Sequence, residues 1–188
     1  AHLLELDRVG LLRERERALE APVLEALRLF VARRADGVPV AYLTGHREFW
    51  SLDFAVDARV LVPRPETELL VETALALAAH APPGPLVEVG TGSGAVAVAL
   101  ARELPAREIL AVDDSAAALA VAAINVARLA PGRVSVRESD LLAAFDAGCC
   151  ALVVSNPPYV EDDWPGLTGA ALRHEPRQAL AAGADGLA

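Results

Sequence analysis

The sequence predicts an α/β fold in which an open, doubly wound parallel sheet follows a small helical region and a linking β-hairpin. Three patterns indicate this architecture. Apolar residues recur at helical spacing up to about residue 37, and alternate with a period of two from residue 49 to 62. After residue 85, short uninterrupted apolar segments alternate with helical ones, which is typical of βαβ units.

The helical region and the hairpin precede the sheet. Pro22 suits the first position of a helix. An apolar stripe follows it at helical spacing, formed by Val23, Leu27, Phe30 and Val31, and Arg34 continues the same spacing. The alternation from 49 to 62 predicts a strand pair, whose turn Asp57-Ala58-Arg59 could hold. Two prolines, Pro63 and Pro65, then predict an extended entry into a helix from about 67 to 80.

The remaining residues predict the sheet. We expect strands at 86–89, 108–112, 134–137 and 151–154, and helices at 95–103 and 116–129. An open sheet of this kind binds its ligand at the carboxyl ends of the strands. The residues that follow each strand are therefore the candidates for a functional site.

The composition favours a globular, acidic protein. Hydrophobic residues make up 54% of the 188 residues, so disorder is not expected. No apolar run approaches the ~20 residues that span a bilayer, and we expect neither a membrane span nor a signal peptide. The net charge of −9 argues against a surface that neutralises many phosphates, and so against direct binding of nucleic acid.

The sequence contains two adjacent cysteines, Cys149 and Cys150, and no others. They are too few for a disulfide framework or a zinc site, so we expect no metal and a reducing, cytoplasmic location. The simplest interpretation makes them small buried residues at the start of a strand. The sequence contains no methionine, which leads us to expect a fragment of a longer chain.

A glycine-rich loop follows the first strand of the sheet. Glu88-Val89 lead into Gly90-Thr91-Gly92-Ser93-Gly94, and a helix is expected at once. Glycines let the backbone turn tightly and bring a ligand close to the helix N-terminus. A dinucleotide fold would show G-x-G-x-x-G, whereas this G-x-G-x-G spacing is similar to loops that pack on S-adenosylmethionine. A simple turn is the alternative.

Acidic residues follow the second and third strands. Asp113 comes about 20 residues after the glycine loop, where a carboxylate accepts hydrogen bonds from ribose hydroxyls. Its neighbours Asp114 and Ser115 suit the cap of the next helix. Asp140 is a candidate to flank an adenine, although an ordinary loop aspartate explains it almost as well.

The fourth strand runs into Asn156-Pro157-Pro158-Tyr159. Successive prolines fix the backbone and remove two N–H donors, which leaves carbonyl groups to face a ligand. The Asn156 side-chain oxygen and the Pro157 carbonyl could accept both hydrogens of one planar NH₂ group, on which Tyr159 could stack. This arrangement favours methyl transfer to an amide or an exocyclic amine, with Asn156, Pro157 and Tyr159 as the catalytic residues.

These motifs resemble those of the HemK/PrmC family, the release-factor glutamine-N5 methyltransferases. The resemblance also includes three further stretches, Pro39–Gly45 through Trp50, Leu61–Glu68 and His174–Leu187, and it covers most of the chain from about residue 39. It implies a Rossmann-like, class I methyltransferase domain. It also implies that the family's chain continues past Leu187, with strands that complete the sheet and are expected to be absent here.

The resemblance implies roles for individual residues. Gly90, Thr91, Gly92 and Gly94 would line S-adenosylmethionine, with Glu88 near its amino-acid end and Asp113 and Asp140 on its nucleoside. Asn156 would contact both cofactor and substrate. With Pro157, Pro158 and Tyr159 it would hold the glutamine of a release factor's Gly-Gly-Gln loop. The stretch that contains Arg64 and Glu66 would form a wall of the substrate pocket, but the sequence defines no chemical role for either residue.

The expected organisation is a docking domain at 1–46 for a release factor, a hairpin linker at 47–63 and a methyltransferase domain at 64–188. Four alternatives remain at this point. An adenine-N6 methyltransferase presents the same planar NH₂ group, and a sister family modifies glutamine in a ribosomal protein. A nicotinamide oxidoreductase would share the glycine loop and Asp113, and a non-catalytic binding module is the fourth.

Overall fold

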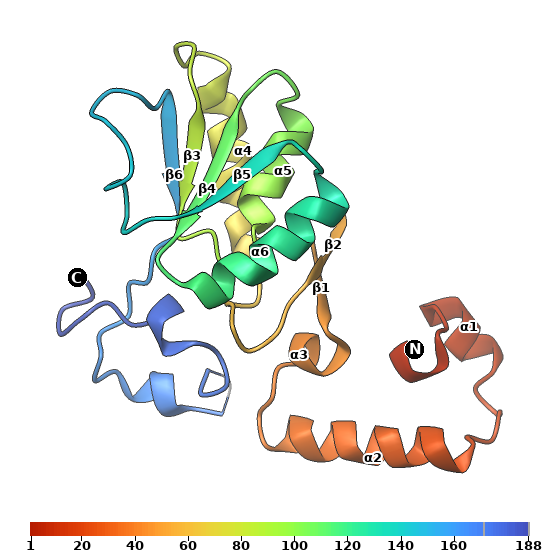
Figure 1. The fold of residues 1–188 in the computed structure, drawn as a ribbon. Coiled ribbons are helices and arrows are strands. Elements are labelled where there is room, and N and C mark those ends of the chain that lie inside the picture. The colour runs from red at the N-terminus through yellow and green to blue at the C-terminus, as the bar shows by residue number, and fades with distance from the viewer. Residues whose placement is uncertain (171, 188) are drawn as a thin grey trace.

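A computed structural model of the chain describes residues 1–170 and 172–187. The chain first forms an N-terminal group of helices, then a β-hairpin, then a four-stranded sheet with helices against it (Figure 1). The final segment, from residue 156 onward, runs past the carboxyl ends of the strands. Within the described residues, no helix combines the length and apolar character that crossing a membrane requires.

The central sheet is parallel throughout. Its strands are β3 (Leu86–Val89), β4 (Ile109–Asp113), β5 (Val134–Glu138) and β6 (Leu152–Ser155). Their order is β5-β4-β3-β6, which places β3 and β4 inside the sheet. All four predicted strands form, and the parallel sheet with flanking helices is confirmed. The uninterrupted apolar character of β3, all of whose residues are buried, reflects its central position.

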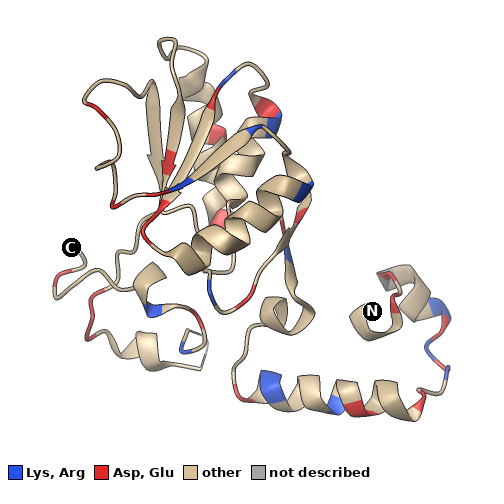
Figure 2. Cartoon of the chain, in the orientation of Figure 1, with Lys and Arg blue, Asp and Glu red and all other residues tan. Residues whose placement is uncertain are grey.

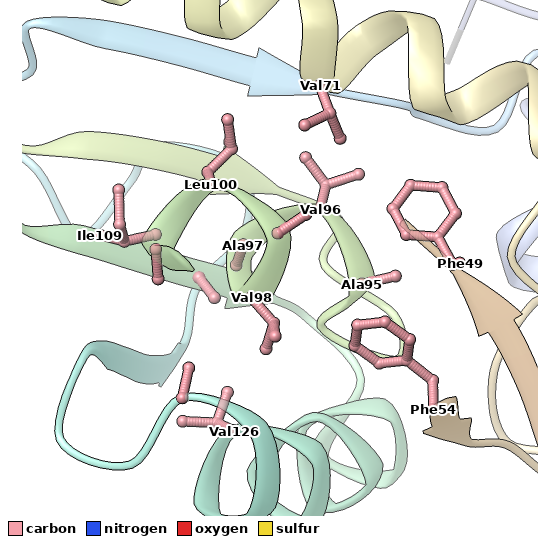
Figure 3. Packing of buried hydrophobic residues seen from close by; sticks show 14 of the residues in the cluster. Phe49, Phe54, Val71, Ala95, Val96, Ala97, Val98, Leu100, Ile109 and Val126 are labelled. Atoms are coloured by element: carbon pink, nitrogen blue, oxygen red, sulfur yellow. The ribbon is translucent and has the colours of Figure 1, made fainter. Parts of the chain in front are cut away.

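Three helices pack against one face of the sheet: α4 (Glu68–Ala78), α5 (Ala95–Glu103) and α6 (Ala116–Leu129). α5 lies between the other two and buries its residues Ala95 to Ala101. Its small side chains allow this close approach. Figure 3 shows Val96 of α5 facing Val71 of α4, and Val98 facing Val126 of α6.

The opposite face of the sheet carries a smaller apolar cluster. Val87, Val89 and Val112 are buried there, covered by Phe145 and Cys150 from the loop between β5 and β6. The expectation that both cysteines are buried was wrong. Cys149 is exposed and Cys150 is only partly buried, because this loop is the covering layer and no described element packs over it.

The hairpin forms earlier in the chain than the alternation suggested. It pairs β1 (His46–Phe49) with β2 (Leu52–Ala55), and its turn is Trp50-Ser51 rather than residues 57–59. Both turn residues have positive φ, at 54° and 56°. The turn is fixed by tertiary contacts, since the Trp50 backbone N–H donates to Glu68 and its indole N–H donates to Glu103.

The apolar residues after β2 do not form a second strand of the hairpin. Val56, Val60 and Val62 are buried against the main core, although they lie in irregular chain. Ala58, which the alternation also included, is exposed, so the period of two does not continue in the structure. Figure 3 shows the two hairpin aromatics, Phe49 and Phe54, reaching the same core beside Ala95.

The N-terminal helices form as predicted. They are η1 (His2–Leu4), α1 (Arg8–Arg13), α2 (Ala21–Ala35) and α3 (Val40–Thr44). Pro22 is the second residue of α2 rather than the first. None of the α2 residues is buried, and Leu29 and Val31 are 58% and 60% exposed. The proposed domain boundaries at residues 46 and 63 stay a prediction.

Asn125 on α6 connects the hairpin to the glycine loop. It is completely buried, and its side-chain oxygen accepts from the Ala55 N–H at 2.8 Å. Its NH₂ group donates to the Ala55 and Ser93 carbonyls, each at 2.9 Å. A buried polar group without its partner costs about 1–3 kcal/mol, so this side chain holds three otherwise unpaired backbone groups.

We therefore expect Asn125→Ala to lower the free energy of unfolding by roughly 2–4 kcal/mol, because it leaves these backbone groups without partners and opens a cavity. Urea denaturation followed by circular dichroism measures the change. The matched control is Ile124→Ala on the same helix, where the side chain is 52% exposed and the expected change is below about 0.5 kcal/mol. Equal losses in the two variants would contradict the role of Asn125.

Candidate active site

The candidate site lies where the parallel strands end. Val89 of β3 is in register with Val112 of β4 on one side and with Ser155 of β6 on the other. Neighbouring strands are about 4.8 Å apart, so Gly90, Asp113 and Asn156 leave the sheet side by side. Asp140 follows β5 and lies on the far side of Asp113 from Asn156. The structure thus brings together the residues that the sequence singled out at four separate positions.

The glycine loop, residues 90–94, needs glycine for its backbone. Gly90, Gly92 and Gly94 have φ of 71°, 55° and 79°, a region that side chains disfavour. The Gly90 and Thr91 N–H groups both donate to the Val112 carbonyl, which anchors the loop on β4. A Cβ at Gly90 or Gly92 would meet no protein atom within 4 Å, so the space above both residues is free for a ligand.

Gly94 has a different role. A Cβ there would lie 3.4 Å from the Cβ of Ala122 on α6, because α5 begins directly after this glycine and packs tightly on α6. The third glycine therefore permits close packing of the two helices, while the first two shape the surface of the loop.

Asp113, at the end of β4, forms a hydrogen bond with the backbone of the glycine loop. Its two carboxylate oxygens accept from the backbone N–H groups of Gly92, at 2.8 Å, and Ser115, at 3.0 Å. Each oxygen retains a further lone pair, which suits a pair of ribose hydroxyls. The ribose contact itself stays a prediction. The expected cap is confirmed for Ser115, whose hydroxyl accepts from the Ala118 N–H at the start of α6.

Glu88 lies on the buried side of the glycine loop, next to the first turn of α5, rather than on the side that faces the free space. Its carboxylate accepts from the Thr91 hydroxyl at 2.6 Å and from the Ala97 N–H at 2.9 Å, and both Glu88 and Thr91 are 4% exposed. These bonds hold the loop against the first turn of α5. Burial raises the pKa of Glu88 to about 8, and burial also raises the pKa of Asp113. Direct contacts of Glu88 and Thr91 with a cofactor stay predictions.

The motif after β6 faces solvent at the same edge. Asn156 and Pro157 are exposed, Pro158 is half-buried, and Tyr159 is 73% exposed. The Ser155 hydroxyl donates to the Val89 carbonyl at 2.9 Å, which fastens the end of β6 to the strand that carries the glycine loop. The Asn156 NH₂ group donates to the Thr67 hydroxyl at 3.3 Å. The motif therefore stands beside the loop with its polar atoms accessible.

The structure gives Arg64 a role that the sequence left open. Arg64 forms an ion pair with Glu175 at 2.5 Å, and the same carboxylate accepts from the Val62 N–H at 3.0 Å. The Glu175 side chain is only 2% exposed. This contact fastens the segment after β6 to the segment before α4. The stretch His174–Arg177 was noted in the sequence, but nothing in its spacing indicated Arg64 as the partner.

A second tether lies on the other side of the site, where the Gln178 amide donates to the Asp114 carboxylate at 2.8 Å. Acidic residues gather around this edge, as Figure 2 shows where β3, β4 and β5 end. A cationic ligand such as a sulfonium is favoured in such surroundings. The arginines, by contrast, are spread over the hairpin, the helices and the loops (Figure 2).

The raised pKa of Glu88 has a measurable consequence. Between its ordinary value of 4.5 and about 8, the folded chain keeps a proton that the unfolded chain has released. The free energy of unfolding therefore falls as the pH rises through this window. Asp113 acts in the same direction.

We expect Glu88→Gln to flatten this decline, because a neutral amide oxygen can accept the same two hydrogen bonds at every pH. Urea denaturation of both proteins between pH 5 and 8, without ligand, measures the difference. Parallel pH profiles would show that Glu88 is ionised in the folded chain and would contradict the interpretation.

Two family models match the chain. The methyltransferase small domain matches residues 65–183, and the PrmC N-terminal domain matches residues 1–45. The chain is 45% identical over 186 residues to the release factor glutamine methyltransferase of Xylella fastidiosa (strain 9a5c), covering 99% of this chain and 68% of that protein. It is 41% identical over 187 residues to the one from Escherichia coli (strain K12), covering 100% and 67%.

Among solved structures, the hMettl16 catalytic domain in complex with a MAT2A 3′UTR hairpin superposes with a TM-score of 0.56 at 17% identity. The match covers 73% of this chain and 53% of that one, and it confirms the methyltransferase fold. Together with the glycine loop, the identities over nearly the whole chain leave no ambiguity about the family. The chain belongs to the release factor glutamine methyltransferases, enzymes that use S-adenosylmethionine.

Proposed function

We propose that this chain transfers the methyl group of S-adenosylmethionine to the side-chain amide nitrogen, N5, of the glutamine in the Gly-Gly-Gln motif of a peptide-chain release factor. The observation that carries the proposal is the position of Asn156-Pro157 directly beside the glycine loop, which the register of β3 and β6 imposes. The curated relatives are named for this substrate.

The residues at the edge fit the cofactor. The free space above Gly90 and Gly92 would take its methionine and ribose portions, and Asp113 would accept from the ribose hydroxyls. Asp140, exposed after β5, would flank the adenine. S-adenosylmethionine supplies an electrophilic methyl group on a positively charged sulfur. The acidic residues that gather at this edge of the sheet would favour that positive charge.

The chain's own contribution to transfer would be orientation. The Asn156 side-chain oxygen and the Pro157 carbonyl would accept the two N–H bonds of the substrate amide, and Tyr159 would stack against its plane. An amide nitrogen is a weak nucleophile because its lone pair is delocalised. Two acceptors would hold it in line with the methyl group and favour the more tetrahedral nitrogen of the transition state. Positioning of this kind can lower a barrier by ~7–11 kcal/mol.

The N-terminal helices would dock the release factor. α2 presents exposed apolar residues, including Leu29 and Val31, among its three arginines and Glu25. An adenine-N6 methyltransferase remains the main alternative. The net charge of −9 and the dispersed arginines argue against it, because DNA binding needs a basic surface. A release factor as partner would also imply a cytoplasmic location, because the termination of translation takes place there.

Transfer of labelled methyl from S-adenosylmethionine to three acceptors tests the proposal. These are a release factor, the same factor with its Gly-Gly-Gln glutamine changed to glutamate, and duplex DNA. We expect label on the intact factor alone, because only it presents an amide nitrogen in a loop that can enter the site. Label on DNA, or on the glutamate variant, would contradict the proposed target.

Asn156→Ala should reduce transfer at least about 100-fold and leave S-adenosylmethionine binding nearly intact, because the variant loses an acceptor for the substrate amide. Calorimetric titration with the cofactor and steady-state transfer measure the two effects separately. Equal loss of binding and transfer would place Asn156 in the cofactor site alone.

Gly92→Ala should weaken S-adenosylmethionine binding about 10-fold or more, because its Cβ enters the space above the loop. Calorimetric titration measures the dissociation constant. Gly132→Ala is the matched control. Gly132 has φ of 71° and open space around it, so it carries the same backbone strain, but it lies in the turn between α6 and β5. Equal weakening in both variants would mean that strain, rather than occupied space, is responsible.

A further inference from the structure

Thr67 forms a hydrogen bond with Asn156 of the motif after β6. Its hydroxyl oxygen accepts a hydrogen bond from the Asn156 NH₂ group at 3.3 Å, although 89 positions separate the two residues in sequence. We infer that Thr67 is a positioning residue for methyl transfer, which holds the Asn156 side chain in place with its oxygen free for the substrate. This inference rests on the proposed function, since it concerns the same substrate-holding side chain.

The orientation of this amide decides whether it can hold a substrate. A side-chain amide carries its acceptor oxygen and its donor NH₂ group on opposite arms of one plane. When the NH₂ arm is bonded to Thr67, the oxygen arm points away from Thr67 and is available to accept. The flipped amide would present two N–H donors to a substrate NH₂ group, which itself can only donate, and the pair would repel.

Burial alone does not hold Asn156, because the residue is exposed. An exposed asparagine rotates readily about the bond to its amide, and each orientation can hydrogen-bond to water. A fixed position of this side chain therefore needs a specific partner, which the Thr67 hydroxyl supplies. Because a hydroxyl can accept or donate, the orientation itself is selected by the substrate NH₂ group, which only donates and so requires the oxygen arm to face it.

Thr67 is itself held firmly. It ends the short helix η2 (Pro65–Thr67), and its backbone N–H donates to the Arg64 carbonyl at 3.0 Å. Arg64 is in turn fixed by the buried Glu175. The chain that enters α4 is thereby anchored on the segment that follows Asn156, so Thr67 and Asn156 keep their separation. This connection gives a physical reason for the Arg64–Glu175 pair beside the site.

Three variants separate the hydroxyl from the rest of the side chain. Thr67→Val keeps the shape and loses the hydroxyl, Thr67→Ser keeps the hydroxyl, and Thr73→Val is the matched control. Thr73 lies on α4 in the next turns, exposed, with its hydroxyl bonded to the Leu69 carbonyl. Methyl transfer to a release factor would be measured for each, with the affinity for S-adenosylmethionine and the urea midpoint.

We expect Thr67→Val to lower kcat about 3- to 10-fold, the loss that corresponds to one hydrogen bond, with KM for the release factor unchanged. Thr67→Ser and Thr73→Val should keep the original kcat. In an Asn156→Ala background, Thr67→Val should have no further effect, because the side chain that it orients is gone. Failure of serine to preserve activity, a parallel loss of cofactor affinity, or additive losses in the double variant would each overturn the inference.

The orientation can also be observed without activity. The side-chain NH₂ group of Asn156 gives its own NMR signals in ¹⁵N-labelled protein, and its heteronuclear NOE reports motion on the picosecond to nanosecond timescale. This NOE should fall in Thr67→Val and persist in Thr67→Ser. An unchanged NOE in Thr67→Val would overturn the inference even if transfer is observed. A fall in the NOE without transfer to any acceptor would reject the proposed function alone.

Discussion

The register of β3 with its two neighbours is the constraint on which the site depends. Val89 lies opposite Val112 and Ser155 at once, so the chain leaves three adjacent strands at the same level. Each exit carries a different group: the glycine loop, a carboxylate and an asparagine. A shift of any strand by one residue would turn its side chains to the other face and dismantle the arrangement.

The glycine loop depends on polar groups that are expensive to bury. Glu88 supports it from below and Asp113 from the side, and burial raises the pKa of both. The folded chain therefore gives up stability at neutral pH at the place where the cofactor would bind. Such a balance is usual at functional sites, where charge is arranged for the ligand rather than for the isolated fold.

The segment after β6 is held by contacts at widely separated points. Glu175 bonds to Arg64 and Val62 on one side, Gln178 bonds to Asp114 on the other, and Arg173 forms an ion pair with Asp36 near the end of α2. This segment therefore touches the N-terminal region, the entry to α4 and the cofactor side of the sheet. Its course around the site follows from these pairs, because it contains little regular secondary structure.

The sequence by itself determined the elements of the sheet and the identity of the site. Periodicity located β3 to β6 and α4 to α6 closely, and the spacing of Gly90, Gly92 and Gly94 pointed to the cofactor, because these signals are local and repeat within a few residues. Tertiary structure decided the turn at Trp50-Ser51, the burial of Asn125 and the partners of Arg64 and Thr67. Each of these rests on a bond between residues distant in sequence, which no local pattern records.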